Sequence, residues 1–253
     1  MNRLATGCAL LTVLISGCDE PPKGKPGTAK SAAAASAKPA VTAAEPAKPK
    51  TMPDLLVDPE GPYLGGRRID MAAANGKDKL NDVIKDLPIN GLPTTLMVEK
   101  KAKTPHVAAV VQALGAAGAP KVIIKTDGRD DLPKEVVVIP ESRLTSAPPA
   151  CAVAAMVLKD LSTAVWPQKG GLGKRQRKGL AGPDLSHTGE TLEKDLAGCD
   201  STVAFFSSDD EVVWEDAFNL AGTIVISDKK KHIDTLVLTH EAPVAGRPLN
   251  LAK

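Results

Sequence analysis

Cys18 is the residue of this sequence with the clearest chemistry. It follows Ile15-Ser16-Gly17, so an apolar residue stands three positions before it and two small residues come directly before it. One positive charge, Arg3, and an apolar stretch from Cys8 to Ile15 precede this tetrapeptide. The pattern is typical of a bacterial lipoprotein signal, because the signal peptidase needs small side chains beside the bond that it cleaves. We expect residues 1–17 to be removed and Cys18 to carry a diacylglycerol.

The same segment predicts where the chain works. The alternative is an ordinary signal peptide with a chance Cys, and either signal places the mature chain outside the cytoplasm. The apolar stretch is too short for a transmembrane helix, and no later stretch reaches 18 apolar residues. We therefore expect a lipid-anchored protein of the cell envelope that faces the periplasm, with the membrane as one partner. Asp19 resembles an inner-membrane retention signal, but which membrane holds the anchor stays open.

Cys151 and Cys199 are the cysteines that remain once Cys8 is removed and Cys18 is lipidated. In an oxidising compartment two remaining cysteines most simply pair, so we predict a disulfide between them. The alternative is two buried thiols that never meet. The distance between the two Cα atoms decides, because more than about 7 Å cannot be bridged without backbone movement.

A run of glycines and cations between Gly170 and Gly179 is the one local charge cluster. Its basic side chains are Lys174, Arg175, Arg177 and Lys178. Glycines with Lys and Arg can cradle a phosphate or an acidic polymer, although the spacing fits neither a P-loop nor a dinucleotide-binding turn. The alternative is a mobile, solvated loop. If this loop binds a ligand, an anionic cell-wall or envelope polymer is the expected one.

Other polar residues favour structural roles. The four histidines (106, 187, 232 and 240) do not cluster with Cys or carboxylates at metal-ligand spacings, and no nucleophile elbow is present. We expect no metal, no cofactor and no enzymatic activity. The formal net charge is +2, and the signal and tether carry more cations than anions, so no nucleic-acid surface is expected. Asp209-Asp210-Glu211 suits a helix N-terminus. Trp166 and Trp214 are expected to pack between layers, with sugar stacking as the alternative.

The elements that position these residues begin after a tether. Residues 18–52 are rich in Pro, Ala and Lys and hold almost no large apolar residue, so they cannot form a core. About 200 residues follow, enough for one large domain or two small ones. In their first half the patterns predict strands at Leu55–Val57, Tyr63–Met71, Thr94–Val98 and Lys121–Lys125, with helices at Lys77–Leu87 and from a Thr104 cap onward. Glu135–Ile139 is expected to form a hairpin with the last of these strands.

The second half has the same order with longer loops. Strands are predicted at Ala152–Leu158, Ser162–Trp166, Thr202–Phe206 and Ile233–Leu238, with helices starting at Ser186 or Thr188 and spanning Val212–Ala221. The expected fold class is α+β, with two tandem β-β-α-β-α-β domains, each a small sheet with two helices on one face. The boundaries are 53–142 and 143–253. Such a repeat changes the interpretation of the whole chain.

Several sequence segments resemble those of a known family. They are LLVDPEGPYLGGRRID (55–70), KDKLNDVIKDL (77–87) and TTLMVEKKAKTPHVAAVVQALGAAGAPKVIIKT (94–126), with a more divergent copy in STVAFFSSDDEVVWEDAFNLAGTIV (201–225) and HIDTLVLT (232–239). These segments resemble the periplasmic domain of the ExbD/TolR family of biopolymer-transport proteins. Members of the family carry an N-terminal transmembrane helix with an acidic residue, and a lipobox and a tether take that place here.

The resemblance implies a periplasmic module that dimerises and contacts cell-wall glycan or partner proteins. It transfers no energising role and no individual binding residue. We therefore expect a non-enzymatic binding or scaffolding lipoprotein that contacts peptidoglycan or envelope proteins, linked to biopolymer transport and able to form a homodimer. The alternative function is a periplasmic hydrolase with dispersed site residues. A flat surface is expected for the first and a deep pocket with converging polar groups for the second.

Overall fold

Aliphatic strands and amphipathic helices alternate from Leu55 onward. The computed structural model describes residues 52–89 and 91–251, and the signal, the lipidation site and almost all of the predicted tether lie outside them. The helices are α1 (Gly76–Lys85), α2 (Thr104–Ala116), α3 (Leu185–Ala197) and α4 (Trp214–Ser227), with a short 3-10 helix, η1 (Glu141–Arg143). The strands are β1 (Leu55–Asp58), β2 (Gly61–Leu64), β3 (Arg67–Arg68), β4 (Thr94–Val98), β5 (Val122–Lys125), β6 (Glu135–Val138), β7 (Val153–Val157), β8 (Thr163–Pro167), β9 (Lys174–Gln176), β10 (Val203–Ser208) and β11 (Thr235–Leu238).

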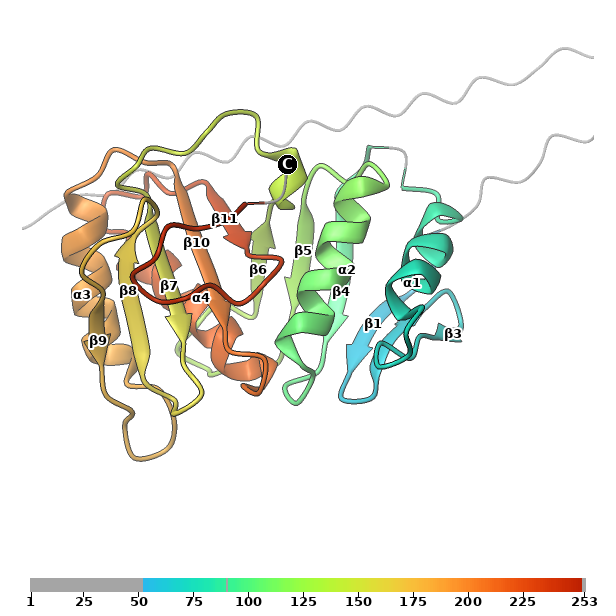
Figure 1. Ribbon diagram of the computed structural model, residues 1–253, viewed down its shortest axis with the longest axis horizontal. Coiled ribbons are helices and arrows are strands. Elements are labelled where there is room, and N and C mark those ends of the chain that lie inside the picture. Colours follow the sequence, from blue (N-terminus) through green and yellow to red (C-terminus); the bar gives the residue numbers. More distant parts are fainter. Residues whose placement is uncertain (1–51, 90, 252–253) are drawn as a thin grey trace, which may run out of the picture. The chain divides into compact units, whose positions relative to one another are not determined.

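All of these strands belong to one mixed sheet of eleven strands, in the order β3-β2-β1-β4-β5-β6-β11-β10-β7-β8-β9 (Figure 1). The chain is therefore α+β, but the prediction of two separate small sheets is wrong. The reason is β6, which pairs antiparallel with β5 in the predicted hairpin and parallel with β11. An unpaired edge strand exposes hydrogen-bonding groups, and β6 satisfies the inner edges of both halves at once.

The two halves have the same topology. We call β1 to β5 the first repeat and β7 to β11 the second repeat. In each, three antiparallel strands, one more than predicted, are followed by a helix, a central strand, a second helix and a last strand, and the central strand lies between the first and last strands. The loops after the central strands also match: the backbone N–H of Glu99 donates to Val57 O, and that of Asp209 donates to Val157 O, both at 2.9 Å. The predicted repeat of element order is present, fused within one sheet.

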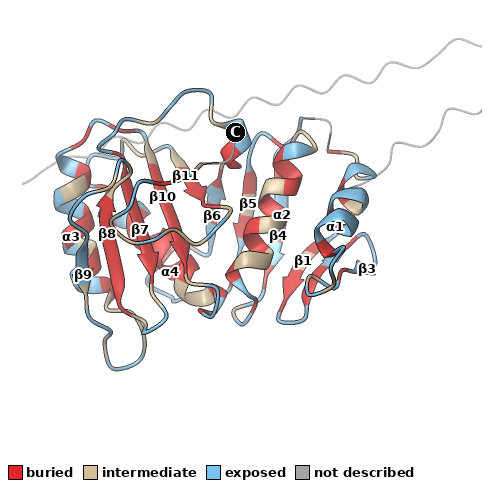
Figure 2. Cartoon of the chain, in the orientation of Figure 1, coloured by how far each residue is buried: buried red, intermediate tan, exposed pale blue. Residues whose placement is uncertain are grey.

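All four helices pack against one side of the pleated sheet. Alternate strand residues such as Val57, Leu96 and Ile124 in the first repeat, and Ala155 and Phe206 in the second, share one continuous apolar core with the helices. Figure 2 shows buried residues along the strands of both repeats. This single core explains why the two repeats do not separate into domains.

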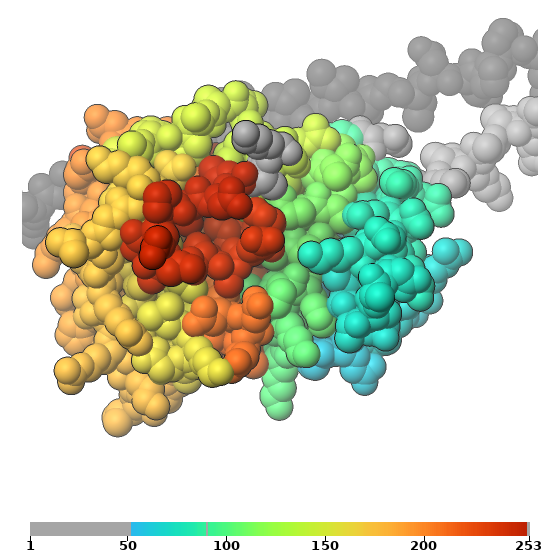
Figure 3. Space-filling model, viewed as in Figure 1, coloured from blue at the N-terminus to red at the C-terminus, as the bar shows by residue number. Residues whose placement is uncertain are grey.

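The other side of the sheet is covered only in the second repeat. There the C-terminal segment, residues 244–251, packs through Leu249 against Trp166, Phe205 and Val237. In Figure 3 this segment lies over the strands of the second repeat. Strands in a sheet rotate by roughly 20–25° from one to the next, so across a sheet this wide the same side of the pleat comes to face the opposite direction. As a result α2 and the C-terminal segment, which cover opposite sides of the pleat, both face the viewer in Figure 1.

Several predicted helix starts are wrong in detail. Lys103, not Thr104, is the cap of α2, and the Thr104 hydroxyl is buried between the repeats. Asp184 caps α3, before both predicted starts, and its side chain accepts a hydrogen bond from the His187 N–H. Val213 precedes α4, and Asp209 instead accepts from the Lys159 N–H at 2.5 Å. Thr104 and Asp209 make tertiary contacts, which a local pattern does not contain, whereas the cap of α3 by Asp184 is a local contact.

Within the described ranges, the helices are too short or too polar to cross a bilayer.

Candidate functional site: a groove along helix α2

The second helices of the two repeats meet at their N-termini. Lys103 and Val213, the residues before α2 and α4, form an isolated antiparallel bridge. The Trp214 N–H donates to Ala102 O at 2.8 Å. Beneath this contact the Trp214 indole donates to the Thr126 hydroxyl at 2.8 Å, and the Ser208 hydroxyl donates to that of Thr104 at 2.8 Å. We call these contacts the seam; they fix α2 relative to the second repeat.

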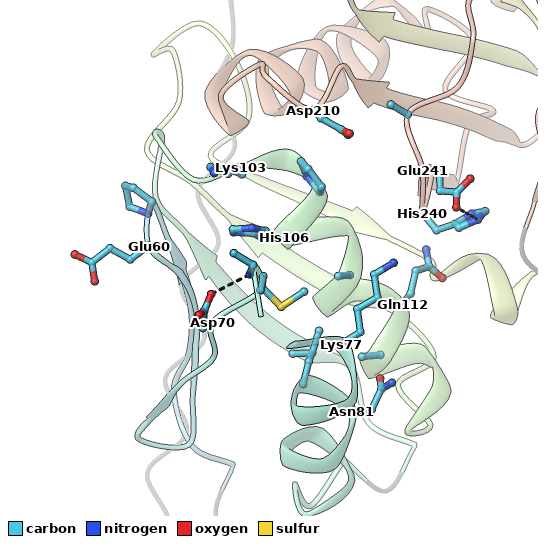
Figure 4. A pocket seen from close by; sticks show the side chains of 18 of the residues that line it. Glu60, Asp70, Lys77, Asn81, Lys103, His106, Gln112, Asp210, His240 and Glu241 are labelled. Carbon is cyan, nitrogen blue, oxygen red and sulfur yellow. Dashed lines mark hydrogen bonds and ion pairs between the residues drawn. The ribbon is translucent and has the colours of Figure 1, made fainter. Parts of the chain in front are cut away.

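A groove runs along the outer side of α2, next to the seam. It encloses about 1030 Å³. Its floor is formed by α2, and one wall comes from α1 and the turns around Glu60 and Asp70, while the other comes from Asp210 and the segment after β11. Its lining includes Met71, Leu80, Pro105, His106, Ala109, Gln112, Ala113, His240 and Glu241. Figure 4 shows Glu60 and Asp70 on one side of the groove and His240 and Glu241 on the other.

The groove exists because the outer side of the second helix is covered in the second repeat and open in the first. Thr104 and Trp214 open α2 and α4, so Ala109 corresponds to Asn219 and Gln112 to Gly222. On α4 these positions are covered: a Cβ at Gly222 would lie 3.2 Å from Pro133 and 3.4 Å from Leu132. On α2 the corresponding positions line the groove instead.

The first helices add to this difference. In the second repeat α3 packs closely on α4, because a Cβ at Gly189 would lie only 3.2 Å from the Ser227 hydroxyl and 3.5 Å from Thr223. In the first repeat α1 is 10 residues long against 13 for α3, and its Leu80 and Asn81 line the groove beside α2. The helix pair of the first repeat therefore leaves a space that the second repeat fills.

One wall of the groove is held by a buried carboxylate. The Glu141 side chain is fully buried, and its carboxylate accepts from the His240 N–H at 2.6 Å and lies 2.9 Å from His240 Nδ1. Gln112 on the floor accepts from the Glu141 N–H at 3.2 Å and donates to Leu238 O at 3.3 Å. These bonds connect α2, η1 and the end of β11, so this wall is preorganised.

His106 lies at the opposite end of the floor. Its Nδ1 is buried without a hydrogen-bond partner. Burial lowers the pKa of His106 below the usual range, and the positive charge of Lys103 lowers it further. His106 is therefore neutral near pH 7 and offers an imidazole to a ligand without adding charge.

The lining combines an uncharged floor with walls of both signs. Lys77 and Lys103 contribute positive charge, and Glu60, Asp70 and Asp210 contribute negative charge. Such a surface suits a ligand with apolar groups and charges of both signs. Phe, Tyr and Trp are absent from this lining. Both tryptophans are at most 1 % exposed, so neither is available for sugar stacking. Their burial agrees with the prediction that they pack between layers.

The predicted basic cluster lies elsewhere, at the far edge of the sheet. Part of the expected loop is strand β9, which pairs with β8. Lys174 pairs with Asp195, and Arg175 contacts Asp160 at 2.6 Å. Arg177 and Lys178 are exposed. Two of the four cations are thus already neutralised, and the charge left for an anion is smaller than the sequence indicates.

The predicted cysteine pair is brought together. Cys151, two residues before β7, and Cys199, two residues after α3, are joined by a disulfide with the Cα atoms 5.8 Å apart. It ties the end of α3 to the sheet, away from the groove.

The four histidines lie in different environments. His187 contacts Asp184, and His240 contacts Glu141. His232 Nδ1 lies 2.8 Å from Asp228 Oδ1, but the alignment does not make a hydrogen bond. In the part of the chain that the structure covers, no group of three or more His, Cys, Asp or Glu side chains is arranged to hold a metal ion.

Reasoning from the sequence missed the groove, although one signal was present. The stretch from Thr104 to Ala116 contains no charged residue. An amphipathic surface helix normally carries charged residues on its outer side. An uncharged outer side therefore indicates a helix that is covered or that binds a ligand. The surface is neither the flat one expected for a binding protein nor the deep pocket expected for a hydrolase, but an open groove.

Comparison of the chain with protein-family models, with curated proteins and with solved structures found no match.

Proposed function

We propose that this protein is a non-enzymatic lipoprotein of the cell envelope whose folded part binds a polypeptide segment of an envelope partner in the groove along α2. The observation that carries the proposal is the uncharged floor between walls of both signs. In this proposal the lipidated Cys18 holds the chain on a membrane and residues 19–52 act as the tether. The chain would then serve as a scaffold in the biopolymer-transport machinery that its resemblance implies.

The second repeat supports a polypeptide as the ligand. On α4, the positions that correspond to the groove floor are occupied by the loop after β5, with Leu132 only 7 % exposed. That loop is also held through its backbone, because the Arg129 N–H donates to Asn219 Oδ1 at 3.3 Å. The same fold thus already packs a Leu-Pro segment on this helix position once. A glycan strand is the weaker candidate, because sugar sites rely on exposed aromatic rings.

A photo-reactive amino acid placed at Ala109 tests the proposal in the cells that make the protein. Ala109 lines the groove, and Ala197, at the exposed end of α3, is the matched control position. We expect light to produce a covalent adduct at position 109 that protease shortens and muramidase does not, with none at position 197. Adducts that muramidase releases would identify the cell wall as the ligand. Equal adducts at both positions, or none at 109, would contradict a groove-bound partner.

A groove-filling substitution gives the second measurement. Ala109→Phe adds a ring to the floor without touching the buried side of α2, and Ala197→Phe adds the same ring elsewhere. The first variant is expected to lose at least tenfold of the affinity for the captured partner, and the second to keep it. Both variants should keep the unfolding midpoint of the parent within about 2–4 °C, as expected for surface positions.

A further inference from the structure

The side of the sheet that carries no helix is covered in one repeat and bare in the other. In the second repeat, residues 244–251 cross it with a turn near their start, where the Arg247 N–H donates to Val244 O at 2.9 Å. The Trp166 indole donates to Arg247 O at 2.9 Å, the Leu249 N–H donates to Gln168 O at 3.0 Å, and the Gly171 N–H donates to Gly246 O at 2.9 Å. Only a few backbone bonds hold this segment, and its apolar side chains supply the remaining contact.

In the first repeat the same side presents apolar side chains from five neighbouring strands, with Thr95 next to Ile123 and Lys125 next to Met97 in the strand register. Strand pairing aligns Leu56 with Tyr63 and Met97, and Ile123 with Val137. Met97 is 47 % exposed, Tyr63 is 40 % exposed and Val137 is 39 % exposed. We call these five residues the bare face.

Leu56, Tyr63 and Ile123 of the bare face have buried counterparts on the covered side, and strand pairing matches Tyr63 with Ala164. Met97 corresponds to Ser207, and β6, which carries Val137, has no counterpart. The loop bonds that match Val57 with Val157 also match Leu56 with Met156, and strand pairing matches Ile123 with Val237. Met156 and Val237 are 0 % exposed beneath the C-terminal side of the molecule. At these three positions the second repeat is covered by the chain itself, and the first repeat is not.

Charged residues lie beside the apolar ones of the bare face, with Lys125 aligned next to Met97. Lys125 pairs with Glu135 at 3.5 Å, and Arg68 pairs with Asp58 at 2.6 Å while its guanidinium lies 5.8 Å from the Tyr63 ring centroid. Because these charges neutralise one another, the bare face does not select a strongly charged ligand. The edge strand β3 consists of two arginines, which disfavours addition of a strand at that edge. A ligand here is therefore expected to lie across the face.

We propose that the bare face binds a segment of a partner polypeptide, rich in proline and small aliphatic residues, in the way that the C-terminal segment covers the second repeat. Together with Pro243, which precedes it, that segment has the sequence PVAGRPLNL. Proline-rich segments lose little conformational entropy on binding, because they are already extended. This site is independent of the groove, since α1 and α2 lie on the opposite side of the pleat.

A synthetic peptide with the sequence of residues 241–251 is the probe. Its binding to the full-length chain in detergent micelles is followed by fluorescence anisotropy of a dye on the peptide, with a peptide in which both prolines are serine as the comparison. We expect saturable binding that the serine peptide shows at least tenfold more weakly. Met97→Glu and Val137→Glu are each expected to weaken the binding at least tenfold. Val225→Glu, at a side chain 44 % exposed on α4, is the matched control and should leave it unchanged.

Three outcomes would overturn the proposal. The first is no binding at millimolar peptide. The second is binding that the Met97 and Val137 variants leave intact, which would mean that the peptide exchanges with the C-terminal segment on the second repeat. The third is a change of oligomeric state in these variants by sedimentation, which would make the bare face a contact between two copies. Circular dichroism and the unfolding midpoint confirm that each variant is folded before it is measured.

Discussion

The hydrogen bond between Trp214 and Thr126 makes the joining of the repeats testable. The indole of Trp214 begins α4 in the second repeat, and Thr126 follows the last strand of the first repeat. Their contact is 2.8 Å long and buried, and the Thr126 hydroxyl also donates to Val98 O at 3.1 Å. Trp214 is 0 % exposed, with its ring centroid 6.0 Å from that of Phe218. A change at either residue therefore acts on the core that both repeats share.

The expected free energies follow from these contacts. Trp214→Phe removes the N–H donor, which is worth about 1 kcal/mol, and leaves space beside Phe218 that costs roughly 1–2 kcal/mol more. Thr126→Val keeps the shape but leaves the buried indole N–H without an acceptor, at a cost of roughly 1–3 kcal/mol. In the double variant neither partner remains to be left unsatisfied. Its loss should therefore be smaller than the sum of the single losses by about 1 kcal/mol.

Urea unfolding of the four proteins measures this coupling. Circular dichroism follows both repeats, and in Trp214→Phe the fluorescence of Trp166 follows the second repeat alone. The two signals should change together, because the repeats share one sheet and one core. Losses that add within about 0.3 kcal/mol would refute the contact across the seam. Two separate transitions would refute the single sheet.

Three further predictions concern other parts of the chain. Cys18→Ser should release the protein from membranes, and mass spectrometry of the parent should show a diacylated N-terminal Cys18; an intact Met1 would contradict the lipobox. Replacing Cys151 and Cys199 by Ala, which removes a link between residues 48 apart in the sequence, should lower the free energy of unfolding by roughly 4 kcal/mol if the entropy of the unfolded chain dominates; two free thiols in the unreduced, unfolded parent would contradict the bond. Because the pKa of His106 is lowered in the folded state, the unfolded chain binds more protons, and stability should fall as the pH drops through the usual histidine range near about 6.5. His106→Gln should reduce that slope between about pH 7 and pH 5, and an unchanged slope would show that His106 does not cause it.

The order of strands and helices could be predicted because local patterns carry it. Period-two apolar runs such as Thr94–Val98 and the 3.6-residue period of Lys77–Leu87 both lie where the structure has β4 and α1. The antiparallel pairing of β5 with β6 could also be predicted, but residues 126–134 connect the strands, a longer loop than the expected turn at Asp127-Gly128. Pairing of β6 with β11 could not be predicted, because that parallel contact joins residues far apart in the sequence and depends on a single aligned pair, Leu236 with Val138.

The candidate site could not be predicted for a related reason. The floor of the groove is one continuous uncharged helix, which the sequence does show. Its walls come from five separate segments, and one of them is placed by the buried contact of Glu141 with His240, 99 residues apart. The basic cluster attracted attention because its charges are adjacent in sequence. Its partners Asp160 and Asp195, which neutralise half of it, become visible only in the fold.

The repeats share a topology but differ in how much of their surface the chain itself covers. In the second repeat Leu132 packs on α4 and Leu249 packs on the sheet, so both of its apolar surfaces are filled. In the first repeat the corresponding positions form the groove and the bare face. The segment after β11 takes part in both repeats. His240 and Glu241 line the groove of the first repeat, and the chain then continues to Leu249, which covers the sheet of the second repeat. Loosening of that segment would therefore both expose Trp166 and move a wall of the groove. A fold that fills one repeat from its own chain gains a rigid frame, and in the proposed function that frame holds the open repeat in position for a partner.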